Sequence, residues 1–296
     1  MMCNLVSTDM KIAASELIIN ADGSIFHLHL RPEELADNII LVGDPGRVDS
    51  VRAFFEHEEC ARENREFRSV TGSYKGKRIT VLSTGIGTDN IDIVMTELDA
   101  LANVDFTTRE EKTQKRSLNI LRIGTSGAVQ ADIPLGSFVY ADISIGCDGL
   151  LNWYAEREQV AMADFEEAFK QHCGWTEKLP SPYFVPAGKE MTERFKEGCL
   201  HGMTLSAPGF YGPQGRKVRL GLALPDMIEN FESFEYKGKR LTNIEMESSA
   251  IAGLGALLGH NVGTICCIIA NRHRKDANPD YKARVKELIH YALEKI

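Results

Sequence analysis

The chain has 296 residues, 43% of them hydrophobic, enough for one large domain or two modest ones, and no run of 18 apolar residues that would span a membrane. Its net charge of −8 argues against polymeric nucleic acid as a partner, because proteins that hold nucleic acid by its phosphates are usually basic. The seven cysteines include no Cys-x-x-Cys pair and the N-terminus has no apolar stretch of signal-peptide type, which disfavours disulfide frameworks and zinc sites and favours a reducing, cytoplasmic location.

Apolar runs that end in glycine or small residues alternate along the chain with segments of helical periodicity. Five of these runs predict buried strands, at residues 39–43, 79–84, 118–124, 137–145 and 261–270. Helices are predicted from Val48, from a cap at Thr88 or Asp89, and in the tail after Asn278-Pro279. This alternation favours an α/β fold with a parallel or mixed sheet.

The other segments give no sign of a domain boundary. Residues 105–119 are dense in charge and are interpreted as a surface excursion, and residues 147–200 show no periodicity that assigns their structure. Because no internal repeat or low-complexity tract occurs, we predict a single domain over residues 1–296.

The first motif with chemical potential is Gly43-Asp44-Pro45-Gly46-Arg47-Val48, directly after a predicted strand. A strand that ends in glycine and a tight turn lets backbone amides approach an anion, and Arg47 adds a forked, permanently charged donor suited to phosphate. An ordinary glycine–proline turn with a surface arginine is the alternative. The motif is no Walker loop, since the sequence has no Gly-x-x-x-x-Gly-Lys-Ser/Thr.

The segment Arg122-Ile123-Gly124-Thr125-Ser126-Gly127 repeats this logic, with an arginine in an apolar strand and then a small loop that carries two hydroxyls. A buried arginine requires an acidic partner or a bound anion. The sequence leaves both interpretations open, a structural ion pair and an anion site.

Two carboxylates, Glu245 and Glu247, stand two positions apart in Asn243-Ile244-Glu245-Met246-Glu247-Ser248-Ser249, just before an apolar helix. Extended backbone would place both on one side, where they could accept hydrogen bonds from vicinal hydroxyls such as those of a ribose. A solvated helix start is the alternative, because acidic residues also favour the helix dipole.

Gln214 and Arg216 lie two positions apart in Phe210-Tyr211-Gly212-Pro213-Gln214-Gly215-Arg216. An amide and a guanidinium together match an imide edge such as that of uracil, and Phe210 could pack against a base ring. A turn with polar surface residues is the alternative.

Two weaker patterns receive no assignment. His27 and His29 stand at strand spacing, but a metal site needs more ligands nearby in space, and no metal site is predicted. Gly85-Ile86-Gly87 lacks the third glycine of a dinucleotide fingerprint, since Asn90 occupies that position.

Taken together and in order, these segments resemble the nucleoside phosphorylase family. The resemblance covers most of the chain and runs through FHLHL from residue 26, GDPGRV from 43, NREF from 64, STGIG from 83, RIGTSGA from 122, FYGPQGR from 210, NIEMESS from 243 and ANR from 270. It implies a three-layer α/β/α sandwich with a central mixed sheet. It also implies a metal-independent phosphorolysis that needs no cofactor and uses inorganic phosphate as co-substrate.

The same resemblance implies roles for twelve residues, with Arg122, Gln214, Arg216 and Glu247 as the catalytic set. Phosphate would be held by Gly43, Arg47, Arg122 and Thr125, and ribose by Met246 and Glu247. Uracil would be held by Phe210, Gln214 and Arg216, with Arg272 near the base pocket. Arg65 and His27 would reach the phosphate and the ribose 5′-hydroxyl of a neighbouring subunit, which implies a homo-oligomer, at least a dimer with shared active sites.

The Gln-Gly-Arg of the base motif points to uridine, and so to pyrimidine nucleoside salvage. Purine enzymes of the hexameric branch carry an aspartate where this chain has Asn271, so the acid that protonates a purine is missing. Three alternatives remain: a purine nucleoside phosphorylase, a hydrolytic nucleosidase of the same fold, which would not need the full arginine set, and a non-catalytic nucleoside or phosphate sensor.

Overall fold

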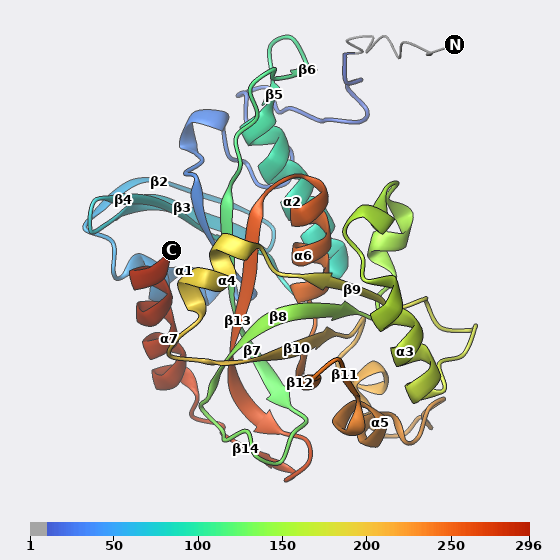
Figure 1. The fold of residues 1–296 in the computed structure, drawn as a ribbon. Coiled ribbons are helices and arrows are strands. Elements are labelled where there is room, and N and C mark those ends of the chain that lie inside the picture. The colour runs from blue at the N-terminus through green and yellow to red at the C-terminus, as the bar shows by residue number, and fades with distance from the viewer. Residues whose placement is uncertain (1–10) are drawn as a thin grey trace, which may run out of the picture.

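The apolar runs form the middle of a mixed twelve-stranded sheet with helices on both faces (Figure 1). The computed structural model describes residues 11–296. The predictions for the extreme N-terminus, including Cys3, concern residues outside this range. Along the sheet the strands follow the order β11-β12-β10-β8-β13-β7-β1-β4-β3-β2, while β14 pairs with β13 and β9 pairs with β8.

The larger strands of this sheet are β1 (Asn38–Val42), β2 (His57–Asn64), β3 (Phe67–Tyr74), β4 (Lys77–Ser83), β7 (Asn119–Ala128), β8 (Phe138–Gly146), β9 (Tyr183–Pro186), β10 (Leu200–Ser206), β12 (Lys239–Glu245) and β13 (Asn261–Asn271). The short ones are β11 (Glu235–Tyr236) and β14 (Asp276–Ala277), and a separate hairpin is formed by β5 (Val104–Asp105) and β6 (Glu110–Glu111). The helices are α1 (Pro45–Arg52), α2 (Thr88–Asn103), α3 (Ala163–Cys173), α4 (Lys189–Phe195), α5 (Met227–Ser233), α6 (Ser248–Leu257) and α7 (Lys282–Lys295).

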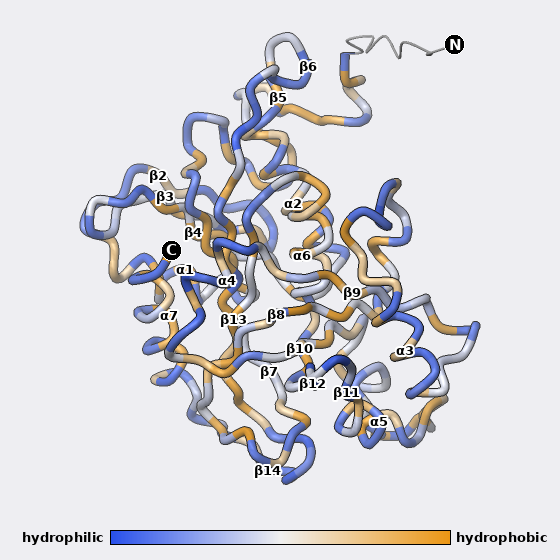
Figure 2. The backbone as a smooth tube through the Cα atoms, in the orientation of Figure 1, coloured by the Kyte–Doolittle hydropathy of each residue, from blue (hydrophilic) through white to orange (hydrophobic). Residues whose placement is uncertain are grey.

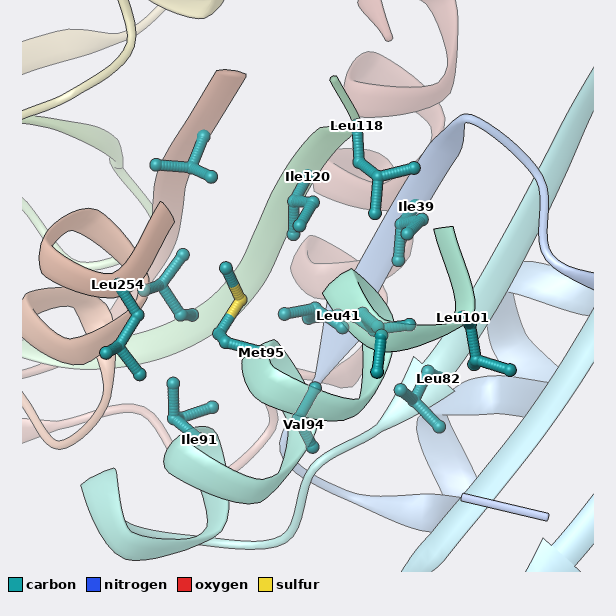
Figure 3. Packing of buried hydrophobic residues seen from close by; sticks show 14 of the residues in the cluster. Ile39, Leu41, Leu82, Ile91, Val94, Met95, Leu101, Leu118, Ile120 and Leu254 are labelled. Atoms are coloured by element: carbon teal, nitrogen blue, oxygen red, sulfur yellow. The ribbon is translucent and has the colours of Figure 1, made fainter. Parts of the chain in front are cut away.

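Alternation along the central strands creates two apolar layers. Ile39 and Leu41 of β1 pack with residues of α2 and α6, as Figure 3 shows, because successive side chains of a strand point to opposite faces. Ile40 and Val42 pack on the other face with residues of α1, α4 and α7. Figure 2 shows the matching pattern of hydropathy, with hydrophobic segments along central strands such as β8. The predicted three-layer α/β/α sandwich with a central mixed sheet is confirmed.

Strand direction decides where the site lies. β1 runs parallel to β4 and β7, and β7 runs parallel to β13, so the carboxyl ends of these strands meet at one edge. β12 is antiparallel to β7, with Ile244 opposite Gly127, and this pairing brings the end of β12 to the same place. The carboxyl edge of such a sheet is where open α/β folds bind ligands.

All five predicted strands are confirmed, but β7 is longer than predicted. It continues beyond the predicted end at Gly124 to Ala128, so Thr125, Ser126 and Gly127 belong to the strand, and the prediction of a small loop there was wrong. The reason is that β13 runs beside this segment and supplies hydrogen-bonding partners as far as Ala128, which a local reading of small residues does not reveal.

The predicted helix starts were less accurate. α1 begins at Pro45, inside the predicted turn, because Asp44 caps it by accepting a hydrogen bond from the Gly46 amide at 2.8 Å. Gly87, and not Thr88 or Asp89, is the residue that precedes α2. Asn278 accepts a hydrogen bond from the Asp280 amide in a local turn, and α7 begins only at Lys282.

The segments left open by the sequence are ordinary parts of the fold. Residues 105–119 contain part of the β5–β6 hairpin, and the stretch 147–200 supplies α3, β9 and α4. Within residues 11–296, no helix has the length and hydropathy needed to cross a membrane. The six cysteines of that range are free thiols.

Candidate active site

A cavity of about 690 Å³ opens at the carboxyl edge of the sheet, where β1, β4, β7, β12 and β13 meet. Nine of the twelve residues that the sequence singled out line it, from four separate segments of the chain. These are Gly43, Arg47, Arg122, Thr125, Phe210, Gln214, Arg216, Met246 and Glu247. His27, Arg65 and Arg272 do not line it.

Arg122 lies at the floor of the site, almost fully buried between two carboxylates. Its Nη1 is 3.1 Å from Oε2 of Glu245, and its Nη2 forms an ion pair with Glu247. Burial by itself lowers the pKa of the Arg122 guanidinium, but the charges of Glu247 and Glu245 outweigh burial and raise it above its usual value. Of the two alternatives left open by the sequence, an acidic partner or a bound anion, the structure shows acidic partners. Nε is buried without a hydrogen-bond partner among residues 11–296.

Gly124 makes this placement possible. A Cβ atom at position 124 would lie 2.1 Å from Nη1 of Arg122, so any larger residue would push the guanidinium out of place. The glycine of the motif is required because the arginine two positions earlier lies flat against it.

Glu245 holds the floor of the site together. Its carboxylate accepts hydrogen bonds from the Ser206 hydroxyl at 2.5 Å and from the Ser248 hydroxyl at 2.8 Å. It also accepts one from the Glu247 amide at 2.9 Å. The sequence drew attention to this carboxylate but assigned a role only to Glu247, because spacing alone does not show that Glu245 faces Arg122.

Glu247 connects the arginine to the loop after β4. Its Oε1 accepts a hydrogen bond from the Gly87 amide at 2.8 Å, and its Oε2 contacts Arg122. Burial raises the pKa of the Glu247 carboxyl, and the nearby charge of Arg122 opposes that rise. The carboxylate lines the cavity with Met246, the residue between β12 and α6, so it can accept hydrogen bonds from a ligand.

Arg47, in the first turn of α1, is the second arginine of the cavity. Its Nη1 donates to the Ile123 carbonyl at 3.4 Å, and no carboxylate of residues 11–296 lies within ion-pair distance of it. Burial lowers the pKa of Arg47, and the charge of Arg122 lowers it further. Two neighbouring cations, one of them without a carboxylate, form a site where an anion would be stabilised.

A polar pair on a short loop, Gln214 and Arg216, forms another part of the cavity lining. Nη1 of Arg216 donates to the Phe210 carbonyl at 2.7 Å and to Oε1 of Gln214 at 2.5 Å. The guanidinium carbon lies 3.8 Å from the centre of the Phe210 ring. Burial, and then the charge of Arg272, lower the pKa of Arg216 to about 10. The amide nitrogen of Gln214 donates no hydrogen bond within the described chain and is available to a ligand carbonyl.

Arg272 contacts this loop from outside the cavity lining, since its Nη2 donates to the Gly215 carbonyl at 3.4 Å. Its neighbour Asn271 is buried and fully occupied. Nδ2 of Asn271 donates to the carbonyls of Gln130 and Ile133, and Oδ1 accepts from the Arg274 amide. Asn271 thus fixes a turn and does not line the cavity.

His27 and Arg65 lie together on the outer side of the fold. Nδ1 of His27 is 2.6 Å from Oε1 of Glu97, and the His27 carbonyl accepts a hydrogen bond from Nδ2 of Asn64 at 2.9 Å. Arg65 is exposed in the turn between β2 and β3, with a φ of 55°. The structure thus brings the FHLHL and NREF segments side by side, although neither His27 nor Arg65 reaches this chain's own cavity.

Several lining residues were not predicted, among them Glu66, Ile86, Asn90, Ser126, Ile244 and Ile269. The signal for Ile86 and Asn90 was present, since the glycine-rich turn at 85–87 follows a predicted strand as Gly43 does. It was set aside as an incomplete dinucleotide fingerprint. Ile244 and Ile269 belong to strands, and only the pairing of those strands brings them to the cavity.

Comparison with known proteins gives a consistent result. The family model of the phosphorylase superfamily matches residues 37–294. A uridine phosphorylase of Thermococcus kodakarensis is 28% identical over 262 residues, which cover 88% of this chain and 83% of the relative. A guanosine phosphorylase of Halorubrum lacusprofundi is 25% identical over 272 residues, 90% of this chain and 94% of the relative.

Among solved structures, a nucleoside phosphorylase of Trypanosoma brucei, described as showing uridine phosphorylase activity, superposes with a TM-score of 0.84. Its sequence is 30% identical, and the match covers 95% of this chain and 100% of that one.

Proposed function

Because the chain belongs to the phosphorylase superfamily, we propose that it uses inorganic phosphate to cleave uridine into uracil and α-ribose 1-phosphate. The observation that carries the proposal is a single cavity that is lined both by Arg47, Arg122 and Glu247 and by the Gln214–Arg216 pair. The cavity thus offers complementary groups to an anion, to a ribose and to the imide of a base. The uridine phosphorylases among its relatives support the same substrate.

The arginines act on the nucleophile. Arg47 and Arg122 hold phosphate by charge-assisted hydrogen bonds, with Thr125 and Gly43 beside it. Holding phosphate below C1′ of the ribose turns the attack into a positioned, effectively unimolecular step. Glu245 also lines the cavity, but its carboxylate is occupied by Arg122 and by protein donors, so it acts as a positioning residue that keeps the Arg122 guanidinium in place.

Glu247 and the base loop act on the substrate. Glu247, with Met246, accepts hydrogen bonds from the ribose hydroxyls and adds negative charge near the cationic sugar of the transition state. As the C1′–N1 bond breaks, its electron pair leaves with uracil, whose oxygens are stabilised by Gln214 and Arg216. A phosphate oxygen forms the new bond to C1′ from the opposite face, so one displacement inverts the anomeric configuration and no covalent enzyme intermediate is needed.

The proposal favours uridine over purine nucleosides. A purine leaving group needs a proton, and position 271, which could have carried an acid, is an asparagine whose amide is fully engaged by backbone groups. The guanosine phosphorylase among the relatives makes the purine alternative worth testing in the same assay.

We also propose a homo-oligomeric assembly, a reaction without a cofactor and a cytoplasmic location. The adjacent placement of His27 and Asn64, together with the exposure of Arg65, fits a homo-oligomer of at least two subunits in which these segments complete a neighbour's site. The reaction needs no metal or organic cofactor. We expect the enzyme in the cytoplasm, where its free cysteines would stay reduced.

The test is a panel of nucleosides incubated with and without phosphate, with base and sugar phosphate quantified by chromatography. Phosphate-dependent release of uracil from uridine is the expected result. Release of uracil without phosphate would identify a nucleosidase, faster cleavage of inosine or guanosine would identify a purine enzyme, and binding without turnover would identify a sensor.

A further inference from the structure

A second cavity, of about 530 Å³, lies on the other side of Arg47, between α1 and α7. Its walls include Ser50 of α1, Ala53 directly after that helix, and Ala283 and Lys286 of α7. Arg47 and Asp44 line both this cavity and the active-site cavity, so these two side chains form the partition between them. No role in the proposed reaction accounts for a space of this size next to the phosphate-binding arginine.

The second cavity is cationic in an acidic protein. Three basic side chains, Arg47, Lys282 and Lys286, line it against one carboxylate, while the chain as a whole has a net charge of −8. That carboxylate, on Asp44, already accepts a hydrogen bond from the Gly46 amide. Neither lysine makes an ion pair with the residues that the structure describes. A concave site with this charge balance raises the local concentration of small anions.

Arg47, the basic side chain of the partition, is held by few polar contacts. The guanidinium of Arg47 makes one hydrogen bond within the described chain, at 3.4 Å to the Ile123 carbonyl, and no carboxylate anchors it. Arg122 is different, because Glu245 and Glu247 hold it on two sides. An anion that binds Arg47 from the α1–α7 side can therefore be passed to Arg122 by rotation of one unrestrained side chain.

The other opening of the active site is the one a nucleoside would fill. Phe210 and Ile86, which are 51% and 69% exposed, lie among the lining residues, with the base-binding pair next to Phe210. A uridine held there would cover the phosphate site and block that opening to an anion.

Resting on the proposed function, we propose that inorganic phosphate enters and leaves through the α1–α7 cavity, independently of the nucleoside. Phosphate would be collected by Lys282 and Lys286, bound by Arg47 and delivered to Arg122. The two substrates would then bind in either order, because neither obstructs the other's path.

The first test changes the charge of the cavity. The double variant Lys282→Gln/Lys286→Gln should lower kcat/KM for phosphate by roughly 3- to 10-fold at low ionic strength, and the difference should shrink as salt screens the lysines. Its kcat at saturating phosphate should stay at the wild-type value. The matched control, Lys115→Gln/Lys178→Gln, removes the same charge from lysines that line neither cavity and should leave kcat/KM for phosphate unchanged.

The second test blocks the cavity without changing its charge. Ala283→Phe places an aromatic ring in the route, so phosphate would have to use the nucleoside opening. At low phosphate, high uridine should then inhibit this variant but not the wild type. Wild-type kinetics in both the lysine and the phenylalanine variants, or uridine inhibition already in the wild type, would overturn the separate route. Absence of uridine phosphorolysis in the wild type would instead contradict the proposed function.

Discussion

Oε2 of Glu245 lies 3.1 Å from Nη1 of Arg122, and this pair joins the end of β12 to the middle of β7. Both side chains are almost completely buried, and the serines at 206 and 248 donate to the same carboxylate. A charge in such a place must be paired, because desolvation of an isolated ion costs several kcal/mol. The pair therefore serves two purposes, which are closure of the sheet around the site and orientation of the arginine.

Removal of Glu245 should damage stability and phosphate binding together. Glu245→Ala leaves Arg122 with one acidic partner and should lower the free energy of unfolding by about 3–5 kcal/mol, which denaturant titration would measure. Glu245→Gln retains an acceptor and should lose less, while kcat/KM for phosphate falls in both. Glu63→Ala, on an exposed side chain, is the control and should change stability by less than about 0.5 kcal/mol. Unaltered phosphate kinetics in Glu245→Gln would show that Glu245 does not position Arg122.

Arg122 itself should matter most for the reaction. Arg122→Ala removes a charge-assisted contact to phosphate and should cost about 2–3 kcal/mol or more of transition-state stabilisation, a loss of roughly 30- to 150-fold in kcat/KM for phosphate. Circular dichroism would show whether the variant folds, since Glu245 and Glu247 lose their partner. A folded Arg122→Ala enzyme with wild-type kcat/KM would mean that phosphate binds elsewhere.

The sequence predicted the site better than it predicted the contacts within it. The strand-then-glycine pattern singled out Gly43 and Arg122, and the structure brings both to one cavity, because the parallel strands β1 and β7 run side by side. It gave no means to see that Arg122 meets two carboxylates more than 120 positions later, since that contact depends on the pairing of β12 with β7. Thr125 was misplaced in a loop for the same reason, because its neighbour in β13 is Cys267.

The sequence also failed to predict where turns end and helices begin. Proline and glycine after Asp44 suggested a turn, whereas the structure uses them as the first turn of α1. Asn278 has a side chain of the kind that caps helices, but it accepts a hydrogen bond from the Asp280 amide in a turn before α7. Such choices are worth about 1 kcal/mol each, so the tertiary contacts of α1 and α7 decide them.

The buried carboxyl of Asp148 should give the protein a distinct pH dependence. Burial raises the pKa of Asp148 above 3.8, although Leu150, Tyr183 and Ser249 donate hydrogen bonds to it. Between the unfolded pKa and the raised folded pKa, the native state binds more protons than the unfolded state, so the Asp148 contribution to stability falls as pH rises through this window. Asp148→Asn should lack that fall. Equal slopes of unfolding free energy against pH, from about pH 4 upward, in both proteins would contradict this prediction.

The proposed sharing of sites between subunits predicts complementation. Arg65→Ala and Arg122→Ala should each have strongly reduced activity as pure proteins, because every site lacks one phosphate-binding arginine. In a mixed dimer both substitutions can fall in one site, which leaves the other site intact. Mixing the two variants under conditions of subunit exchange should restore up to about a quarter of wild-type activity, the binomial expectation for random two-fold pairing. Exchange shown by mass spectrometry without any recovery would mean that Arg65 does not serve a neighbour.

Base selectivity should follow from the Gln214–Arg216 pair. Arg216 donates to Oε1 of Gln214 and stacks on Phe210, which leaves the Gln214 amide nitrogen and the other guanidinium N–H groups as donors for a ligand in the cavity. Uracil offers carbonyl oxygens to these donors. Cytosine has an amino group at C4 instead, so two hydrogen-bond donors would face each other and no hydrogen bond would form there. A site built to hydrogen-bond one group can reject an analogue without it by a factor of about 10⁴–10⁵. Cytidine should therefore be a very poor substrate.

Replacement of Gln214 and replacement of Arg216 should change kcat and KM in different ways. Gln214→Ala should raise KM for uridine and lower kcat, because the amide contacts both the bound substrate and the leaving group. Arg216→Ala should chiefly lower kcat, because the charge that it stabilises is greatest in the transition state. Arg216→Lys keeps the charge but loses the stacked, forked geometry and should recover only part of the loss. The measurement is kcat and KM for uridine, cytidine and inosine on wild type and all three variants. Equal kcat/KM for uridine and inosine on the wild type would contradict the assignment of this loop to uracil, because the pair supplies donors to an imide and no acid to a purine.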